Sequence, residues 1–149
     1  MDKLFLDTNI ILDLVSPRPP FSKFAQKLFS KSQKSKITLF ASALSFPNMN
    51  YLLSRVTNKE TAKQVLLKIK PLITILPLND KIIQLALASD FNDFEDAIQY
   101  YTALENNITT LITRDLKDFK KASIKVMSSE EYLNLNYLNF DLALWVCWR

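Results

Sequence analysis

The sequence predicts an α/β fold, a three-layer α/β/α sandwich around a central, mostly parallel sheet of about five strands. Short apolar segments rich in β-branched residues alternate along the chain with segments whose apolar residues recur at helical spacing. Nearly all of the strand candidates are apolar on both faces, which is typical of a parallel sheet covered by helices on both sides. The alternation therefore indicates strand–helix units rather than an all-helical or all-β protein.

Each expected strand is a short apolar stretch without a helical pattern. "ITLFASAL" and "LITILPL" are the clearest, because both contain β-branched residues and neither has a charge. The expected strands are residues 3–7, 37–44, 72–78, 109–113 and 124–127.

The helices are expected from apolar spacing and from capping residues. The first ends at "SPRPPFS", because three prolines in four positions cannot continue a helix. The next contains Phe24, Ala25, Leu28 and Phe29 at helical spacing, and the last starts from Ser128 or Ser129 in the capping pattern "SSEEYL". The remaining expected helices are 9–15, 46–56, 60–70 (opened by Asn58 or Thr61), 80–89 and 93–106.

The length of 149 residues fits one domain, which we expect to span residues 1–133. Residues 134–149 form an apolar C-terminal tail that packs on this domain or lies at a dimer interface. No segment reaches the roughly 20 apolar residues of a membrane helix, and the first strand starts too early for a signal peptide. The single cysteine, Cys147, fits a reducing compartment, so a cytoplasmic protein without membrane contact is expected.

The chain contains no histidine and no glycine. Catalysis by histidine and zinc binding by histidine are therefore excluded, as are the glycine-rich phosphate loops of P-loop and dinucleotide-binding proteins. Positions of positive φ are expected to fall to asparagine, for example at Asn106–Asn107. The formal charge of +4 fits a polyanionic partner such as nucleic acid, and equally an ordinary slightly basic domain.

Acidic residues occur where three segments are expected to meet. Asp7 ends the first strand, Asp115 and Asp118 follow the strand 109–113, and Asp96 lies in "NDFEDAIQYY". Ligands of parallel sheets bind beyond the carboxyl ends of the strands. Carboxylates held together there repel one another, and a divalent cation with oxygen ligands, Mg²⁺ or Mn²⁺, compensates their charge.

Structural roles are the alternatives for each of these acids. Asp7 alone fits a helix cap equally well, and Asp115 and Asp118 fit turn positions. Asn92 is expected to be a helix N-cap with Glu95 completing a capping box, and Asp93 to complement the helix dipole. Asp13 is expected to be an exposed helix residue. Only the combination of acids favours metal chemistry.

Taken in order, "FLDTNIILDL", "ASALSFPNMNYLL", "DFEDAIQYYTAL" and "LITRDLKDF" resemble the PIN domain, a family of metal-dependent ribonucleases. The resemblance covers residues 3 to about 133 and is strongest to the bacterial branch with "DFEDA". Many relatives in that branch are toxins of the VapC type, paired with an antitoxin that blocks the active site. The resemblance therefore implies a PIN-like fold, an RNA substrate, an antitoxin partner and a homodimer.

The resemblance also assigns residues. Asp7, Asp96 and Asp115 match the metal-binding catalytic acids. Asp118 is the alternative metal ligand in members that have asparagine at the position of Asp115, and Glu95 matches a further ligand or a group that holds one. Supporting positions fall on Thr8, Asn9, Thr113 and Asn48. Asn48 is a departure, because many members have glutamate there and an amide adds no negative charge.

The expected function is a Mg²⁺- or Mn²⁺-dependent endoribonuclease, the toxin of a toxin–antitoxin pair, in which Arg114 and Lys117, or Lys120 and Lys121, hold the RNA backbone. One alternative is a catalytically weak PIN-fold scaffold or RNA-binding module, which Asn48 favours. Another is a phosphotransfer domain with an aspartate nucleophile at the end of a strand. That pattern requires a second aspartate two residues on, where this chain has Asn9.

Overall fold

The computed structural model describes residues 1–16, 18–34 and 36–135. Its centre is a sheet of five strands in the order β3-β2-β1-β4-β5, and every neighbouring pair is parallel. The strands are β1 (Asp2–Leu6), β2 (Ile37–Ser42), β3 (Thr74–Leu76), β4 (Thr110–Ile112) and β5 (Lys125–Met127). The predicted α/β fold is confirmed.

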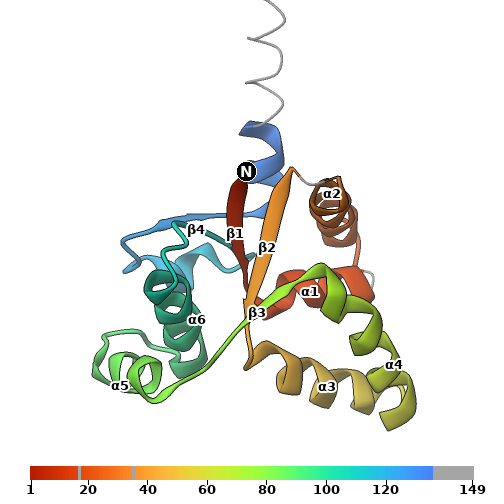
Figure 1. Ribbon diagram of the computed structural model, residues 1–149, viewed down its shortest axis with the longest axis horizontal. Helices are drawn as coiled ribbons and strands as arrows, with labels where there is room; N and C mark the ends of the chain where they lie inside the picture. Colours follow the sequence, from red (N-terminus) through yellow and green to blue (C-terminus); the bar gives the residue numbers. More distant parts are fainter. Residues whose placement is uncertain (17, 35, 136–149) are drawn as a thin grey trace, which may run out of the picture.

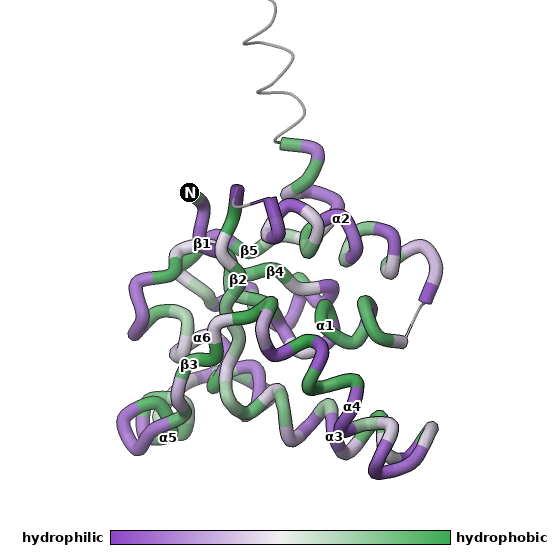
Figure 2. Tube along the Cα trace, turned by 45° about the vertical axis from the view of Figure 1, so that its right-hand side comes forward, coloured by the Kyte–Doolittle hydropathy of each residue, from purple (hydrophilic) through white to green (hydrophobic). Residues whose placement is uncertain are grey.

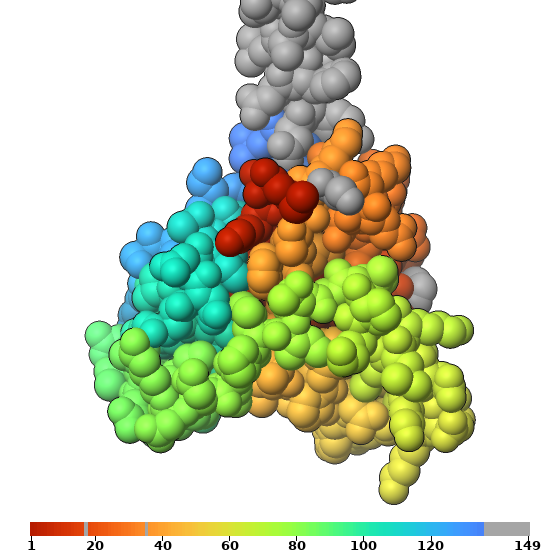
Figure 3. Space-filling view, in the orientation of Figure 1, coloured from red at the N-terminus to blue at the C-terminus, as the bar shows by residue number. Residues whose placement is uncertain are grey.

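Helices cover both faces of the sheet, which Figure 1 shows nearly edge-on between two groups of helices. One face carries α1 (Thr8–Val15), α2 (Phe21–Gln33), α3 (Ser45–Val56) and α4 (Lys59–Ile69), and the other carries α5 (Asp80–Ala88) and α6 (Phe94–Glu105). Two 3₁₀ turns, η1 (Lys70–Leu72) and η2 (Leu116–Phe119), and a helical stretch at 129–135 complete the described chain. In the space-filling view, side chains of α4, β3 and α5 form a continuous band across the lower part of the face turned to the reader (Figure 3).

The strand side chains alternate between two apolar layers, which explains why the strands lack a polar face. Leu4 and Leu6 belong to the core beneath α1–α4, and Phe5 between them belongs to the core beneath α6. All three side chains are at most 1% exposed. Figure 2 shows the same arrangement: hydrophobic residues follow the strands and α1, while hydrophilic ones concentrate on outer turns of α2, α4 and α5. Burial on both faces is what the continuous apolar strand segments predict.

The observed elements agree closely with the expected ones, and three details correct or complete the expectation. Asn58 caps α4 by accepting a hydrogen bond from the Thr61 amide, and Ser128 forms the expected capping box with Glu131. Asn107 has the predicted positive φ, at 57°. The strand expected at 72–78 is shorter, because residues 70–72 form η1 and β3 ends at Leu76 before Pro77, which has no N–H for the ladder.

None of the helices in the described part of the chain is long and apolar enough to cross a membrane. From residue 136 on, the tail expected at 134–149 lies outside the described residues.

Candidate active site

The carboxyl ends of the parallel strands open on an acidic cavity of about 430 Å³. Its walls come from the β1–α1 junction, one face of α3, the start of α6 and the segment after β4. Figure 1 shows these elements meeting below the sheet, at the end opposite the N-terminus. Most of the predicted site residues line it, and the full lining is Asp7, Thr8, Asn9, Leu12, Asn48, Tyr51, Leu52, Asp93, Glu95, Asp96, Asp115 and Asp118.

Asp7 is the most buried acid of the cavity, with 5% of its surface exposed. Its backbone amide continues the sheet by donating to the Ile112 carbonyl over 3.0 Å, which fixes the residue between β1 and β4. The carboxylate makes no side-chain capping hydrogen bond to α1; instead its Oδ2 accepts from Thr113 Oγ1 over 2.8 Å. Asp7 is thus the N-cap residue of α1 by position, as the alternative reading expected, but its side chain bonds Thr113 and not the helix.

Burial raises the pKa of Asp7 from 3.8 to about 6. Hydrogen bonds from the Thr113 hydroxyl and the Thr8 backbone oppose this rise, whereas the charges of Asp115 and Glu95 add to it. The carboxylate is thus desolvated and faces other acids, without a cationic side chain among the causes of its shift.

Asp96 lies in the first turn of α6 and is half-buried. Burial, followed by repulsion from surrounding carboxylates, raises its pKa from 3.8 to about 7; the acids responsible are Asp93, Asp7, Asp118 and Glu95. The expected cap of this helix was wrong: the N-cap is Asp93, not Asn92, and its Oδ1 accepts from the Asp96 amide over 2.9 Å. Because Asp93 takes the capping role, the Asp96 side chain is left to the cavity.

Asp115 is oriented by two contacts from different elements. Its backbone amide donates to Thr113 Oγ1 over 3.0 Å, and its Oδ2 accepts from Asn9 Nδ2 over 3.2 Å. The Thr113 hydroxyl therefore joins the Asp7 carboxylate to the Asp115 main chain. Asp118 follows in η2, where its amide donates to the Asp115 carbonyl over 3.1 Å.

Glu95 and Asn48 face each other across the cavity. The Asn48 Nδ2 donates to Glu95 Oε1 over 2.7 Å, joining α3 to α6. Asn48 therefore holds the Glu95 carboxylate in place, whereas many members of the resembled family have a glutamate at the position of Asn48.

Two site residues were missed by sequence reasoning. Gln99 and Ser45 are completely buried beneath the cavity, where Gln99 Nε2 donates to Thr8 Oγ1 over 3.1 Å and to Ser45 Oγ over 3.3 Å. The two hydroxyls also share a hydrogen bond of 2.8 Å. The one available signal was the spacing of Gln99, three positions after Asp96 and hence on the same helix face.

On a different side of α1, the buried Asp13 carboxylate forms an ion pair with the partly exposed guanidinium of Arg114. Asp13 was expected to be exposed, and that was wrong: its side chain is 2% exposed and its Oδ2 lies 3.2 Å from Arg114 Nε. The guanidinium carbon lies 4.5 Å from the centre of the Phe21 ring. Arg114, a candidate for RNA binding, therefore does not line the acidic cavity, whereas Lys117 lines a smaller cavity that adjoins it.

The donor set of the acidic cavity fits a hard divalent cation. It consists of carboxylate, amide and hydroxyl oxygens, and the raised pKa values of Asp7 and Asp96 reflect burial and repulsion that a cation would relieve. Within residues 1–16, 18–34 and 36–135, no group of three acidic side chains is close enough to hold an ion in the present arrangement.

The structure is therefore an α/β domain with a parallel sheet and a cavity lined by acidic side chains at the carboxyl ends of its strands. Residues 3–117 match the PIN domain family, and the chain belongs to that family. The resemblance to the PIN domain family is confirmed.

Known relatives are similar over nearly their whole length. The chain is 24% identical to Ribonuclease VapC1 of Aquifex aeolicus over 88% of this chain and 93% of that protein. Among solved structures, VapBC2 from Rickettsia felis bound to a DNA fragment from their promoter matches with a TM-score of 0.63 and 17% identity, covering 85% of this chain and 97% of that one. VapC20 of Mycobacterium tuberculosis, a toxin that cleaves the sarcin–ricin loop, matches with a TM-score of 0.59 and 16% identity, covering 72% and 86%.

Proposed function

We propose that this protein is a divalent-metal-dependent endoribonuclease that hydrolyses RNA phosphodiester bonds. The observation that carries the proposal is the convergence of acids from separate segments on one cavity, with the Asp7 carboxylate buried among them. The similarity to a relative named as a ribonuclease supports the same conclusion.

Asp7, Asp96 and Asp115 are the residues that would hold one or two Mg²⁺ or Mn²⁺ ions, with Asp118, Glu95 and the Asn48 amide as further ligands or partners of bound water. Such a cation supplies a nucleophilic hydroxide and stabilises the charge that develops on the phosphoryl group.

The residues of the chain contribute orientation and desolvation. Thr113 holds Asp7 and the main chain of Asp115 in register, and Asn9 fixes the Asp115 carboxylate. Asn48 holds Glu95 against α3. Because Asp7 is almost fully buried, its charge is poorly screened by water and acts strongly on whatever enters the cavity.

The biological setting proposed is a toxin–antitoxin pair in the cytoplasm. The structural relatives include VapBC2 bound to promoter DNA and a toxin that cleaves RNA of the sarcin–ricin loop, which supports a protein antitoxin as partner and RNA as substrate. A homodimer is proposed from the family resemblance.

A second candidate is a PIN-fold scaffold or RNA-binding module with little catalysis. The observation in its favour is Asn48, which adds no negative charge to the cavity and is engaged with Glu95. It predicts RNA binding without cleavage, and no binding of Mn²⁺ at millimolar concentration.

The test compares wild type with Asp7→Asn and Asp115→Asn in an RNA cleavage assay with Mn²⁺. Asp90→Asn is the matched control, because Asp90 is exposed and lies outside the acidic cavity. We expect cleavage by wild type and by the control, and a loss of at least a hundredfold in both cavity variants. Equal cleavage by wild type and Asp7→Asn would remove Asp7 from the site, and calorimetry with Mn²⁺ then separates the nuclease from the scaffold.

A further inference from the structure

A second, lysine-lined cavity of about 150 Å³ adjoins the acidic cavity. The two share the walls formed by Asp93, Asp96 and Asp118, so a molecule held in one reaches the other directly. Lys117, Lys120 and Lys121 line the lysine-lined cavity and no residue of the acidic cavity is basic. Of the residues that line the two cavities, the basic ones therefore lie only on the side of the lysine-lined cavity.

The ammonium groups of this flank differ in their availability. Lys121 Nζ donates to the Asp90 carbonyl over 2.5 Å. Lys117 and Lys120 are exposed, and neither has an ion pair or side-chain hydrogen bond within the described part of the chain. Both are available for an anion, although acids of the shared wall lie beside them.

A polyanionic substrate would need positively charged groups close to the acidic cavity, because the cavity itself is lined by acids and has no basic residue. Six carboxylates face this cavity, and they repel a phosphodiester that approaches without a cation. Lysines beside the cavity attract the phosphates that flank the reacting one, without adding a charge among the acids themselves.

The side of the cavity formed by α3 carries an exposed aromatic ring. Tyr51 lines the acidic cavity with 61% of its surface exposed, and Leu52 next to it is 44% exposed. Arg55 Nη1 donates to the Tyr51 hydroxyl over 3.2 Å, and its guanidinium carbon lies 5.6 Å from the ring centre. The ring is thus held in place while remaining open to solvent. No residue of α3 lines the lysine-lined cavity, so the aromatic and basic groups flank the acids on different sides.

We propose that these groups form a track for an unpaired RNA strand, an inference that rests on the nuclease function proposed above. A base of the strand stacks on Tyr51, the phosphodiester to be cleaved lies among the acids, and a neighbouring phosphate binds Lys117 and Lys120. Stacking on a protein ring requires a base that is free of its own helix, so the substrate class is single-stranded or looped RNA rather than continuous duplex.

Binding is measured in the Asp7→Asn background with Mg²⁺, which allows RNA to bind while cleavage is suppressed. The probe is a fluorescein-labelled, unstructured RNA oligonucleotide, compared with the same strand in a duplex. We expect Tyr51→Ala to weaken binding of the single strand about tenfold and Tyr51→Phe to retain most of it, because phenylalanine keeps the stacking face.

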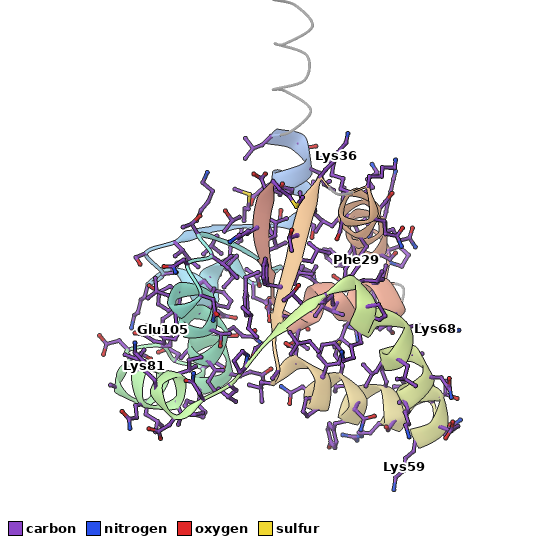
Figure 4. The ribbon with its side chains drawn as sticks, viewed as in Figure 1. Phe29, Lys36, Lys59, Lys68, Lys81 and Glu105 are labelled. Carbon is purple, nitrogen blue, oxygen red and sulfur yellow. The ribbon has the colours of Figure 1, made fainter. Side chains whose placement is uncertain are left out.

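The lysines are tested through the salt dependence of the same binding. For a single strand, the slope of log K against log salt changes by about 0.7 for each phosphate that a lysine neutralises. Lys117→Gln/Lys120→Gln should therefore flatten this slope. The matched control is Lys34→Gln/Lys36→Gln, which removes the same charge. Lys36 lies at the amino end of β2, whereas the cavities lie at the carboxyl ends of the strands (Figure 4).

The outcomes separate the track from the nuclease. Cleavage by wild type, with RNA binding that is unchanged in the Tyr51 and lysine variants, overturns the track and leaves the nuclease standing. Binding that depends on these residues, without cleavage by wild type, supports the track and refutes the nuclease. Absence of measurable binding, equal affinity for the duplex, or the same flattening of the slope in the control also overturns the track.

Discussion

Replacing Asp7 by asparagine should stabilise the metal-free protein at neutral and alkaline pH. The wild-type carboxylate is 5% exposed and lies among other acids, so ionising it in the folded state is costly. An asparagine side chain has nearly the same shape, and its carbonyl oxygen still accepts the hydrogen bond from Thr113. The substitution therefore removes the charge and leaves the packing in place.

The size of the effect follows from the pKa. Each pKa unit corresponds to about 1.4 kcal/mol, so the rise from 3.8 to about 6 corresponds to roughly 3 kcal/mol. The folded state binds the Asp7 proton more tightly than the unfolded state does. The stabilisation of the wild-type fold by the protonated Asp7 is therefore present below pH 3.8, decreases as the pH rises towards 6, and is lost above about pH 7. In a chain of this length the difference amounts to about 6–12 °C in Tm.

The assay is urea unfolding of both proteins with EDTA, at pH 4 and at pH 8. We expect similar stabilities at pH 4 and a more stable Asp7→Asn at pH 8, with Asp90→Asn following wild type at both. Adding Mn²⁺ should then stabilise wild type and Asp90→Asn more than Asp7→Asn, because the last protein lacks one of the carboxylates proposed to bind the ion. A variant that is no more stable than wild type at pH 8, or a difference that is the same at both pH values, would refute the reasoning.

Three further predictions concern the groups around the cavity. Arg114→Met should lower the free energy of unfolding by about 1–3 kcal/mol, because the buried Asp13 carboxylate loses its ion pair and keeps only the charge of Arg18 nearby. Asp13→Asn added to it should recover most of this loss in urea titrations, and an additive loss would contradict the pair. Thr113→Val removes a hydrogen bond that lowers the pKa of Asp7, so the acidic limb of the cleavage–pH profile should move to higher pH. A limb that does not move would show that the Thr113 hydroxyl does not set the pKa of Asp7. Gln99→Leu removes the bonds to the hydroxyls of α1 and α3 and should cost about 1–2 kcal/mol, measured by thermal unfolding with the Asp90→Asn protein as control.

The fold was largely predictable because its signals are local. Leu4, Phe5 and Leu6 are apolar in succession between the charged residues Lys3 and Asp7, a short apolar run that favours a strand buried on both faces. The shortening of β3 is also local in origin, since Pro77 interrupts the ladder, but the sequence alone did not decide whether the strand ended there or continued as an edge.

The site was predictable only in part, because its remaining features depend on contacts between distant segments. The convergence of Asp7 and Asp115 follows from the rule that parallel strands end at one edge, whereas Asp96 lies in the first turn of α6 and was assigned to the site through the family resemblance. The burial of Asp13 depends on Arg114 far along the chain, and no helical pattern reveals such a partner. The choice between Asn92 and Asp93 as cap turns on one residue of register, which lies within the ordinary uncertainty of helix boundaries.

The hydrogen-bonded group of Thr8, Ser45 and Gln99 has a consequence for how such proteins diverge. It joins α1, α3 and α6 through uncharged groups, so part of the framework beneath the cavity is held together without the acids. A related protein that has lost the carboxylates of the cavity should therefore keep these three side chains bonded and the three helices joined, because none of the bonds involves a charged group.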